Sequence, residues 1–324
     1  MIKLMVDRSN PHTKSAYGGD GWRPRLTALR DELGTTRWAN GGIDSEYAAL
    51  KQVLLYRPGQ ELAASADFKA VQMLEPLDIG KAIDQHDALA QAYRDNGVTV
   101  HYAEVVGQAP TPNQMFMADL FVMTPEGAII ARPASEVRAG EERWAARKIA
   151  DLGIPIVRSV SGRGTFEGAD LMWLDPKTAI IGRGLRTNDE AIEQIASILA
   201  DMGVDLIDVD MPIGTMHLMG MLRFLDKDLA LAWPVRLVHR AVDALRERGY
   251  RVVFFPDEKE ARDGMAFNLV NLGPGKVLMA AGNPITERFF TELGVECITT
   301  PVDELAKAAG AIGCLTGILE RAKT

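Results

Sequence analysis

The sequence predicts an α/β-propeller, a ring of five strand–strand–helix–strand units around a pseudo-fivefold axis. Two observations predict this fold. Five helical-looking segments each end in a glycine that an apolar strand follows at once, at Gly97, Gly153, Gly203, Gly249 and Gly294, with spacings of 56, 50, 46 and 45 residues. Four hairpin-like stretches lie between these segments. A repeat of this length is typical of propellers and other arrays.

The helix of each unit is predicted from the residues before its glycine. Glycine accepts the left-handed conformation that commonly follows the last turn of a helix. The five segments are HDALAQAYRDNG (86–97), ERWAARKIADLG (142–153), NDEAIEQIASILADMG (188–203), VRLVHRAVDALRERG (235–249) and PITERFFTELG (284–294).

The first two strands of each unit are predicted from an apolar run, a turn and a second apolar run. The four complete hairpins are LFVMTPEGAIIARP (120–133), LMWLDPKTAIIGRG (171–184), MLRFLDKDLALAWP (221–234) and LVNLGPGKVLMAAG (269–282). A fifth unit is assembled from both ends of the chain, with one strand at 315–320 and another at 50–58. Joining the two ends in one sheet is a common way for a radial repeat to protect its edge strands.

The domain organisation follows from where the repeat begins. We expect residues 41–324 to form a single catalytic domain and residues 1–40 to be an N-terminal extension. The extension is rich in Gly, Arg and Asp and carries Trp22 and Trp38. A lid, an arm that packs against another subunit and a partly ordered tail all remain open for it.

Composition excludes several function classes. The net charge of −8, with no basic block, argues against nucleic acid as the main partner. No apolar stretch is long enough for a membrane span, and the N-terminus lacks the apolar core of a signal peptide. Two cysteines give no disulfide framework, so we expect a cytoplasmic protein.

One polar residue recurs near the start of the first strand of each unit. The set consists of Asp119, Glu167 with Asp170, His217, Asn268 and Cys314. Each alone has an ordinary interpretation: a turn cap, a core histidine, or a small core thiol in the apolar strand around GCLTG. In a ring they would converge near the axis, where buried carboxylates are costly unless they meet a cation. A thiol, an imidazole and carboxylates in one polar well favour a cysteine nucleophile, a base and a cage for a cation.

Seven motifs give the chain a resemblance to a known family. They are PNQMFMAD (112–119), FEGAD (166–170), GRGLRTN (182–188), MHL (216–218), NLGPGKV (271–277), GN (282–283) and GCLTG (313–317). With these motifs the chain resembles the guanidino-group-modifying enzymes of the pentein fold. Within that superfamily it looks most like arginine deiminase, with dimethylarginine dimethylaminohydrolases and amidinotransferases as its other branches.

The resemblance implies three catalytic residues. The cysteine matching Cys314 attacks the guanidinium carbon and forms a covalent thiouronium. The histidine matching His217 protonates the leaving amine and then activates water, and the glutamate matching Glu167 holds that imidazole.

The resemblance also implies a set of residues that bind substrate. Asp119 would pair with the guanidinium, while Arg138 and Arg186, each 19 residues after a site carboxylate, would bind the α-carboxylate. The remaining candidates are Asp170, Asn113, Phe116 and Met219.

Three departures from arginine deiminase concern the substrate. Met219 stands where an aspartate follows the histidine by two residues in that family. The arginine that shortly precedes the nucleophile there is absent, and Gly313 replaces a bulkier residue. Dimethylarginine dimethylaminohydrolases also lack the aspartate, which favours an N-substituted guanidine here.

The predicted function is therefore hydrolysis of the guanidino group of arginine or of a related, N-substituted guanidino acid. An amidinotransferase, in which an amine resolves the thiouronium, and a non-catalytic binding protein are the alternatives. No metal or cofactor is predicted, since two cysteines and five scattered histidines show no ligand spacing. The predicted partner is a small guanidino substrate carrying a carboxylate, and a homo-oligomer such as a dimer stays open.

Overall fold

The computed structural model describes residues 14–63 and 67–324. Five three-stranded sheets form the body of the molecule. In each sheet the central strand pairs antiparallel with one neighbour and parallel with the other, as a strand–strand–helix–strand unit requires. The prediction of five such units is confirmed.

Four sheets come from consecutive residues and the fifth joins the two ends of the chain. The consecutive sheets are β3 (Phe121–Thr124), β4 (Gly127–Ile130) and β5 (Ile156–Ser159); β6 (Leu171–Asp175), β7 (Thr178–Arg183) and β8 (Asp205–Asp210); β9 (Leu222–Asp226), β10 (Leu229–Ala232) and β11 (Arg251–Phe254); and β12 (Val270–Gly273), β13 (Lys276–Ala280) and β14 (Glu296–Thr300). The fifth sheet has the order β15 (Gly317–Arg321), β1 (Leu50–Leu55) and β2 (Thr99–Tyr102).

One helix precedes the parallel strand of each sheet. These helices are α2 (Ile79–Asp95), α3 (Glu142–Asp151), α4 (Asp189–Asp201), α5 (His239–Glu247) and α7 (Pro284–Glu292). All five glycines expected to follow them have left-handed backbone, with φ between 74° and 82°. Asp78 and Asn188 cap α2 and α4 by accepting from backbone N–H groups of the first turn.

Short helical turns stand at the starts of the innermost strands. They are η4 (Met117–Asp119), η6 (Gly168–Asp170), η7 (Leu218–Gly220) and α8 (Ile312–Leu315). The remaining short helices are η2 (Ser15–Tyr17), α1 (Leu29–Glu32), η3 (Gln60–Ala63), η5 (Glu136–Arg138), α6 (Glu258–Arg262) and η8 (Leu305–Ala308). Cys314 was expected in the apolar strand around GCLTG, and this is wrong in detail: Cys314 lies in α8, and the strand begins at Gly317.

Burial decreases from the first strand of a unit to the third. In β3, β6 and β9 four residues in a row are buried, whereas β5 and β11 have the pattern exposed, half-buried, half-buried, exposed. The first strands of the units, which lie innermost, are therefore largely continuous apolar runs in the sequence. Neighbouring sheets are also joined by polar contacts, since the buried Trp173 donates its indole N–H to the Met123 carbonyl at 3.0 Å.

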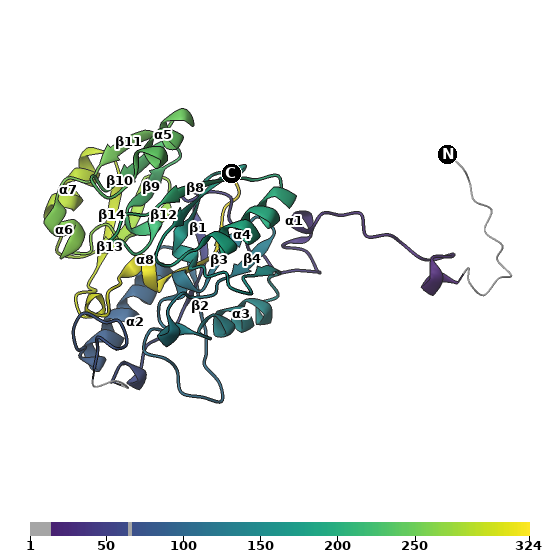
Figure 1. Cartoon of the computed structure of the whole chain (residues 1–324), viewed down its shortest axis with the longest axis horizontal. Helices are drawn as coiled ribbons and strands as arrows, with labels where there is room; N and C mark the ends of the chain where they lie inside the picture. The colour runs from purple at the N-terminus through teal and green to yellow at the C-terminus, as the bar shows by residue number, and fades with distance from the viewer. Residues whose placement is uncertain (1–13, 64–66) are drawn as a thin grey trace.

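The N-terminal extension differs from the rest of the chain. Figure 1 shows residues 14–28 running away from the body, while the C-terminus lies on it. Contact begins with α1, where the Arg30 guanidinium donates to Glu126 and to the carbonyl of Met202, each at 3.0 Å. Within the described residues, no helix has the length and apolarity that crossing a membrane needs.

Candidate active site

Two cavities meet at Cys314. The smaller, of about 20 Å³, is lined by Gln72, Asn113, Phe116, Asp119, Arg138, Arg186, Met216, Ala308, Ala309 and Cys314. The larger, of about 350 Å³, is lined by Cys314 and His217 and mainly by apolar side chains, among them Met216, Met219, Met221, Trp233, Met265 and Phe267. We call them the polar cavity and the apolar cavity. No described residue of the extension (14–40) lines either one.

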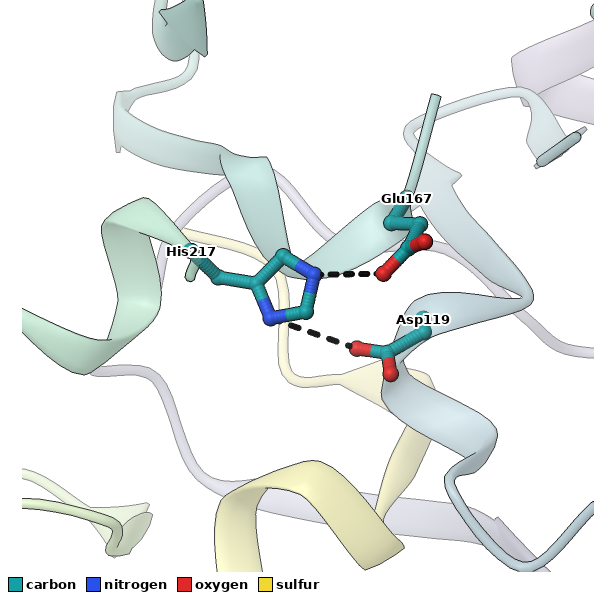
Figure 2. A group of neighbouring side chains, drawn as sticks. All are labelled: Asp119, Glu167 and His217. Atoms are coloured by element: carbon teal, nitrogen blue, oxygen red, sulfur yellow. Dashed lines mark hydrogen bonds and ion pairs between the residues drawn. The ribbon is translucent and has the colours of Figure 1, made fainter. Parts of the chain in front are cut away.

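His217 lies between two carboxylates. Its Nε2 is 2.6 Å from Glu167 Oε2, and its Nδ1 is 3.8 Å from Asp119 Oδ1 (Figure 2). The three residues stand at the starts of adjacent units, so the ring brings side chains 48 and 50 residues apart into contact. All three are buried.

Glu167 and His217 stabilise each other's charged forms. Burial alone would lower the pKa of His217, but Asp119, Glu167 and Asp170 together raise it to about 9. Burial would likewise raise the pKa of Glu167, yet His217, Arg138 and Arg186 lower it to about 2. At neutral pH the pair is therefore an imidazolium and a carboxylate, ready to donate a proton.

Arg138 and Arg186 lie beside the carboxylates. The Arg138 Nη1 is 2.6 Å from Asp119 Oδ2, its Nε is 2.9 Å from Glu141 Oε2, and its face lies over the Phe116 ring. Arg186 Nη1 donates to both oxygens of Glu167, at 3.0 and 3.1 Å. Two guanidinium groups thus neutralise a buried acidic cluster.

Two buried polar atoms in the polar cavity's lining residues have no hydrogen-bond partner: Asp119 Oδ1, an acceptor, and Arg138 Nη2, a donor. Leaving either group unpaired in a protein interior is costly. Asp119 Oδ1 can therefore still accept a hydrogen bond from a cationic donor, and Arg138 Nη2 can still donate one to an anionic acceptor.

Cys314 contacts an amide that sequence reasoning had placed in the ring but had not assigned to the site. Asn268 Nδ2 donates to Cys314 Sγ at 3.0 Å, and Asn268 Oδ1 accepts from the Cys314 backbone N–H at 3.2 Å. Burial and the nearby Asp119 raise the pKa of the thiol, while Asn268 and Arg223 act to lower it. The thiol is thus held in place but is not ionised by its surroundings alone.

Arg223 was missed altogether. It comes from β9, is buried, and donates from Nε to the Phe267 carbonyl at 3.2 Å, while its Nη2 has no partner. A Cβ at position 313 would collide with this Nη2 and lie 2.8 Å from Asn268 Oδ1. Gly313, noted above as a departure, thus leaves room for an arginine and an amide beside the Cys314 thiol.

The other candidate residues divide between two places. Asn113, whose Nδ2 donates to the Val71 carbonyl at 2.8 Å, and Phe116 line the polar cavity, and Met219 lines the apolar one. Asp170 lines neither cavity. Its Oδ1 accepts from the Leu218 backbone N–H and its Oδ2 from the Thr187 hydroxyl, so it fixes the turn that follows His217 rather than facing a substrate.

Within the described part of the chain, Asp119, Glu167 and His217 form a group whose ligand atoms lie within 4.8 Å of one another, close enough to hold a metal ion. Arg138 and Arg186 already pair with both carboxylates. A metal ion would have to compete with two guanidinium cations there, so the donor set does not fit a dedicated metal centre.

Comparison with known proteins agrees with this arrangement. The family model for eukaryotic N,N-dimethylarginine dimethylhydrolase matches residues 62–232, more than half of the chain. The chain belongs to this family. The model for arginine deiminase, the branch that the motifs favoured, matches residues 235–321. Both models lie within the guanidino-modifying superfamily of the pentein fold, so that assignment is confirmed.

Individual relatives come from the same family. A dimethylarginine dimethylaminohydrolase of Streptomyces coelicolor is 28% identical over 269 residues, covering 82% of this chain and 96% of that protein. A crystal structure of a dimethylarginine dimethylaminohydrolase variant, solved as an adduct with S-methyl-L-thiocitrulline, matches with a TM-score of 0.68 and 25% identity, covering 84% of this chain and all of that one. An amidinotransferase of Microseira wollei, with a TM-score of 0.73 and 14% identity over 88% of this chain and 98% of that one, shares the fold.

Proposed function

We propose that this protein hydrolyses the guanidino group of an arginine-like amino acid that carries a substituent on the guanidinium. The observation that carries the proposal is a pair of buried atoms without a hydrogen bond, Asp119 Oδ1 and Arg138 Nη2, on two residues that line the polar cavity. Asp119 would accept from the guanidinium, and Arg138 with Arg186 would bind the α-carboxylate. Membership of the dimethylarginine dimethylhydrolase family supports the same substrate class.

The first half of the reaction uses Cys314 and His217. A bound guanidinium cation lowers the pKa of the nearby thiol, which releases its proton to solvent. The thiolate attacks the guanidinium carbon, and the bond from this carbon to one nitrogen breaks as the His217 imidazolium protonates that nitrogen. An amine leaves, and a thiouronium remains on Cys314.

The second half returns the enzyme to its first state. The neutral imidazole of His217 takes a proton from water, and the hydroxide attacks the thiouronium carbon. The carbon–sulfur bond then breaks as the hydroxyl proton of this intermediate passes to the sulfur, which frees a ureido amino acid and restores the Cys314 thiol. Glu167 stabilises the imidazolium in both steps, a role that its 2.6 Å contact with His217 and the raised pKa of His217 support.

The test is a substrate panel with separate readouts for amine and ureido product. We expect turnover of Nω-methylated derivatives of L-arginine in preference to L-arginine itself, loss of all turnover in Cys314→Ser, and a mass adduct on the Cys314 peptide after an acid quench. The matched control is Cys297→Ser, because Cys297 lies half-buried in β14 and lines neither cavity. Near-wild-type turnover in Cys314→Ser would sink the proposed mechanism.

A further inference from the structure

The apolar cavity lies on the side of Cys314 to which the reaction would release its amine. His217, the proton donor, lines the apolar cavity and not the polar one, whereas both arginines line only the polar one. A substrate with its carboxylate on Arg138 and Arg186 and its guanidinium carbon at Cys314 therefore directs its departing nitrogen towards the apolar cavity.

The residues that line this cavity indicate which kind of chemical group it binds. Met219, Met265, Trp233 and Phe267 provide an apolar and aromatic wall, and thioethers adapt their shape to different partners. The two arginines on its lining already have acidic partners, Arg236 with Glu258 at 3.7 Å and Arg262 with Asp263 at 2.8 Å. Because both arginines are already paired, the cavity does not favour an anionic ligand.

The size of the cavity exceeds what a methyl group needs. Its volume of about 350 Å³ lies in the range of sites that hold small organic molecules, roughly 300–1,000 Å³.

The backbone around the apolar cavity is also unusual. Met265 (φ 52°) and Ala309 (φ 73°) both line the cavity in a left-handed conformation that residues other than glycine rarely adopt. Such conformations concentrate at functional sites.

From these observations we infer that the apolar cavity is a subsite for the departing amine, and that it selects guanidines whose leaving nitrogen carries an alkyl or arylalkyl group larger than methyl. This inference rests on the proposed function and adds the substituent to it. The amine released would be a primary or secondary alkyl- or arylalkylamine, formed by the same bond cleavage and protonation as above.

The direct test compares substrates that differ only in this substituent. We expect kcat/KM for Nω-benzyl-L-arginine to exceed that for Nω-methyl-L-arginine by about tenfold or more, since each buried methylene is worth about fourfold in affinity. The same preference should appear in calorimetric binding to the inactive Cys314→Ser variant, which needs no turnover.

A filled cavity provides the matched variant. A Cβ built at Gly220, which lines the apolar cavity, meets no atom within 4 Å. Gly220→Leu should therefore lower the benzyl-to-methyl ratio of kcat/KM at least tenfold by occupying the subsite. Gly220→Ala, which adds one methyl group, should change the ratio by less than about threefold.

The outcomes separate this inference from the proposed function. Turnover of methylated arginine together with weaker binding and slower turnover of the benzyl compound would overturn the subsite and leave the hydrolase intact. An unchanged ratio in Gly220→Leu would overturn the subsite as well. If no guanidino compound is bound or turned over, the proposed function fails, and the subsite fails with it.

Discussion

Cys314 depends on neighbours that reach it from other units of the ring. Asn268 holds its sulfur, and the cation of Arg223 offsets part of the burial that raises the pKa of the thiol. Burial lowers the pKa of Arg223 itself to about 10, with Cys314 among the groups that act in the other direction. The two groups therefore favour each other's charged forms.

This coupling predicts a pH profile. In the free enzyme, alkylation of Cys314 by iodoacetamide should be slow at pH 7 and should rise with a midpoint above that of an ordinary thiol. Arg223→Met should shift the midpoint further towards alkaline pH, by about one unit, because an opposite charge has been removed. Arg223→Lys should restore much of the wild-type midpoint. An unshifted midpoint in the methionine variant would exclude Arg223 from any electrostatic role.

Glu167 and His217 should act as one unit. Replacing either, as Glu167→Gln or His217→Asn, should lower kcat by on the order of 10²–10⁴ through lost acid–base catalysis. Because the two share a 2.6 Å contact, the double variant should be little slower than the slower single variant. Additive losses in this double-mutant cycle would show that the contact has no part in catalysis.

At this scale, the sequence predicted the residues that the repeat places in register. Asp119, Glu167, His217 and Cys314 stand at equivalent positions of successive units, so a ring must bring them near its axis. Arg223 gave no such signal, because one arginine within an apolar strand looks like a residue of the solvent-facing side. The pairing of Arg138 and Arg186 with the carboxylates likewise depends on side-chain directions that spacing does not specify.

Among the elements, the short helical turns before the inner strands position the candidate site. The turn η6 packs tightly against η4, and Gly168 shows why. A Cβ on Gly168 would collide with the Phe121 carbonyl and lie 2.6 Å from the Ala118 carbonyl, so η6 rests directly on η4. The glycine of FEGAD thereby sets the distance between Glu167, on one turn, and Asp119, on the other.

This close approach predicts that Gly168→Ala will be destabilising. Backbone atoms cannot yield as a side chain can, so overpacking should lower the free energy of unfolding by about 1–3 kcal/mol and should also lower kcat through displaced carboxylates. Urea denaturation and steady-state kinetics measure the two effects. Gly220→Ala is the matched control, since it adds the same methyl group in open space at the end of η7. Equal stability of the two variants would contradict the packing argument.

The elements that could be predicted best from the sequence were those marked by a few neighbouring residues. Gly97 and its four counterparts predicted helix ends, and the PEG, DPK, DKD and GPG turns predicted hairpins. The helix around Cys314 was missed because GAIGCLTGILE is apolar except for Thr316 and Glu320, and such a short run does not distinguish a strand from a buried helical turn.

For the whole molecule, the charged cluster joins three units through buried groups, so its protonation affects global stability. The folded-state pKa of His217 is raised to about 9 from an ordinary value of 6.5. A raised pKa contributes stability that is fully present below about pH 6.5 and is lost as the pH rises through 9.

The difference in unfolding free energy between wild type and His217→Asn should therefore be larger at pH 6 than at pH 9.5. We expect the change to be on the order of 1–3 kcal/mol, as a shift of this size implies for a buried group. Urea unfolding at the two pH values measures it. A difference that stays constant, or grows with pH, would mean that His217 is neutral in the folded protein.

The pairing of β1 with β15 has a consequence during protein synthesis. Sheets such as β6–β7–β8 can form as soon as their own residues leave the ribosome, but Leu54 must wait for its partner Gly317. At 5–20 residues per second this delay is roughly 13 to 50 s. Cys314 is made just before that strand, so it joins a ring whose other four sheets can already be in place. A nascent chain should thus hold the carboxylates, the histidine and the two arginines while remaining without activity until residues 314–321 have left the ribosome.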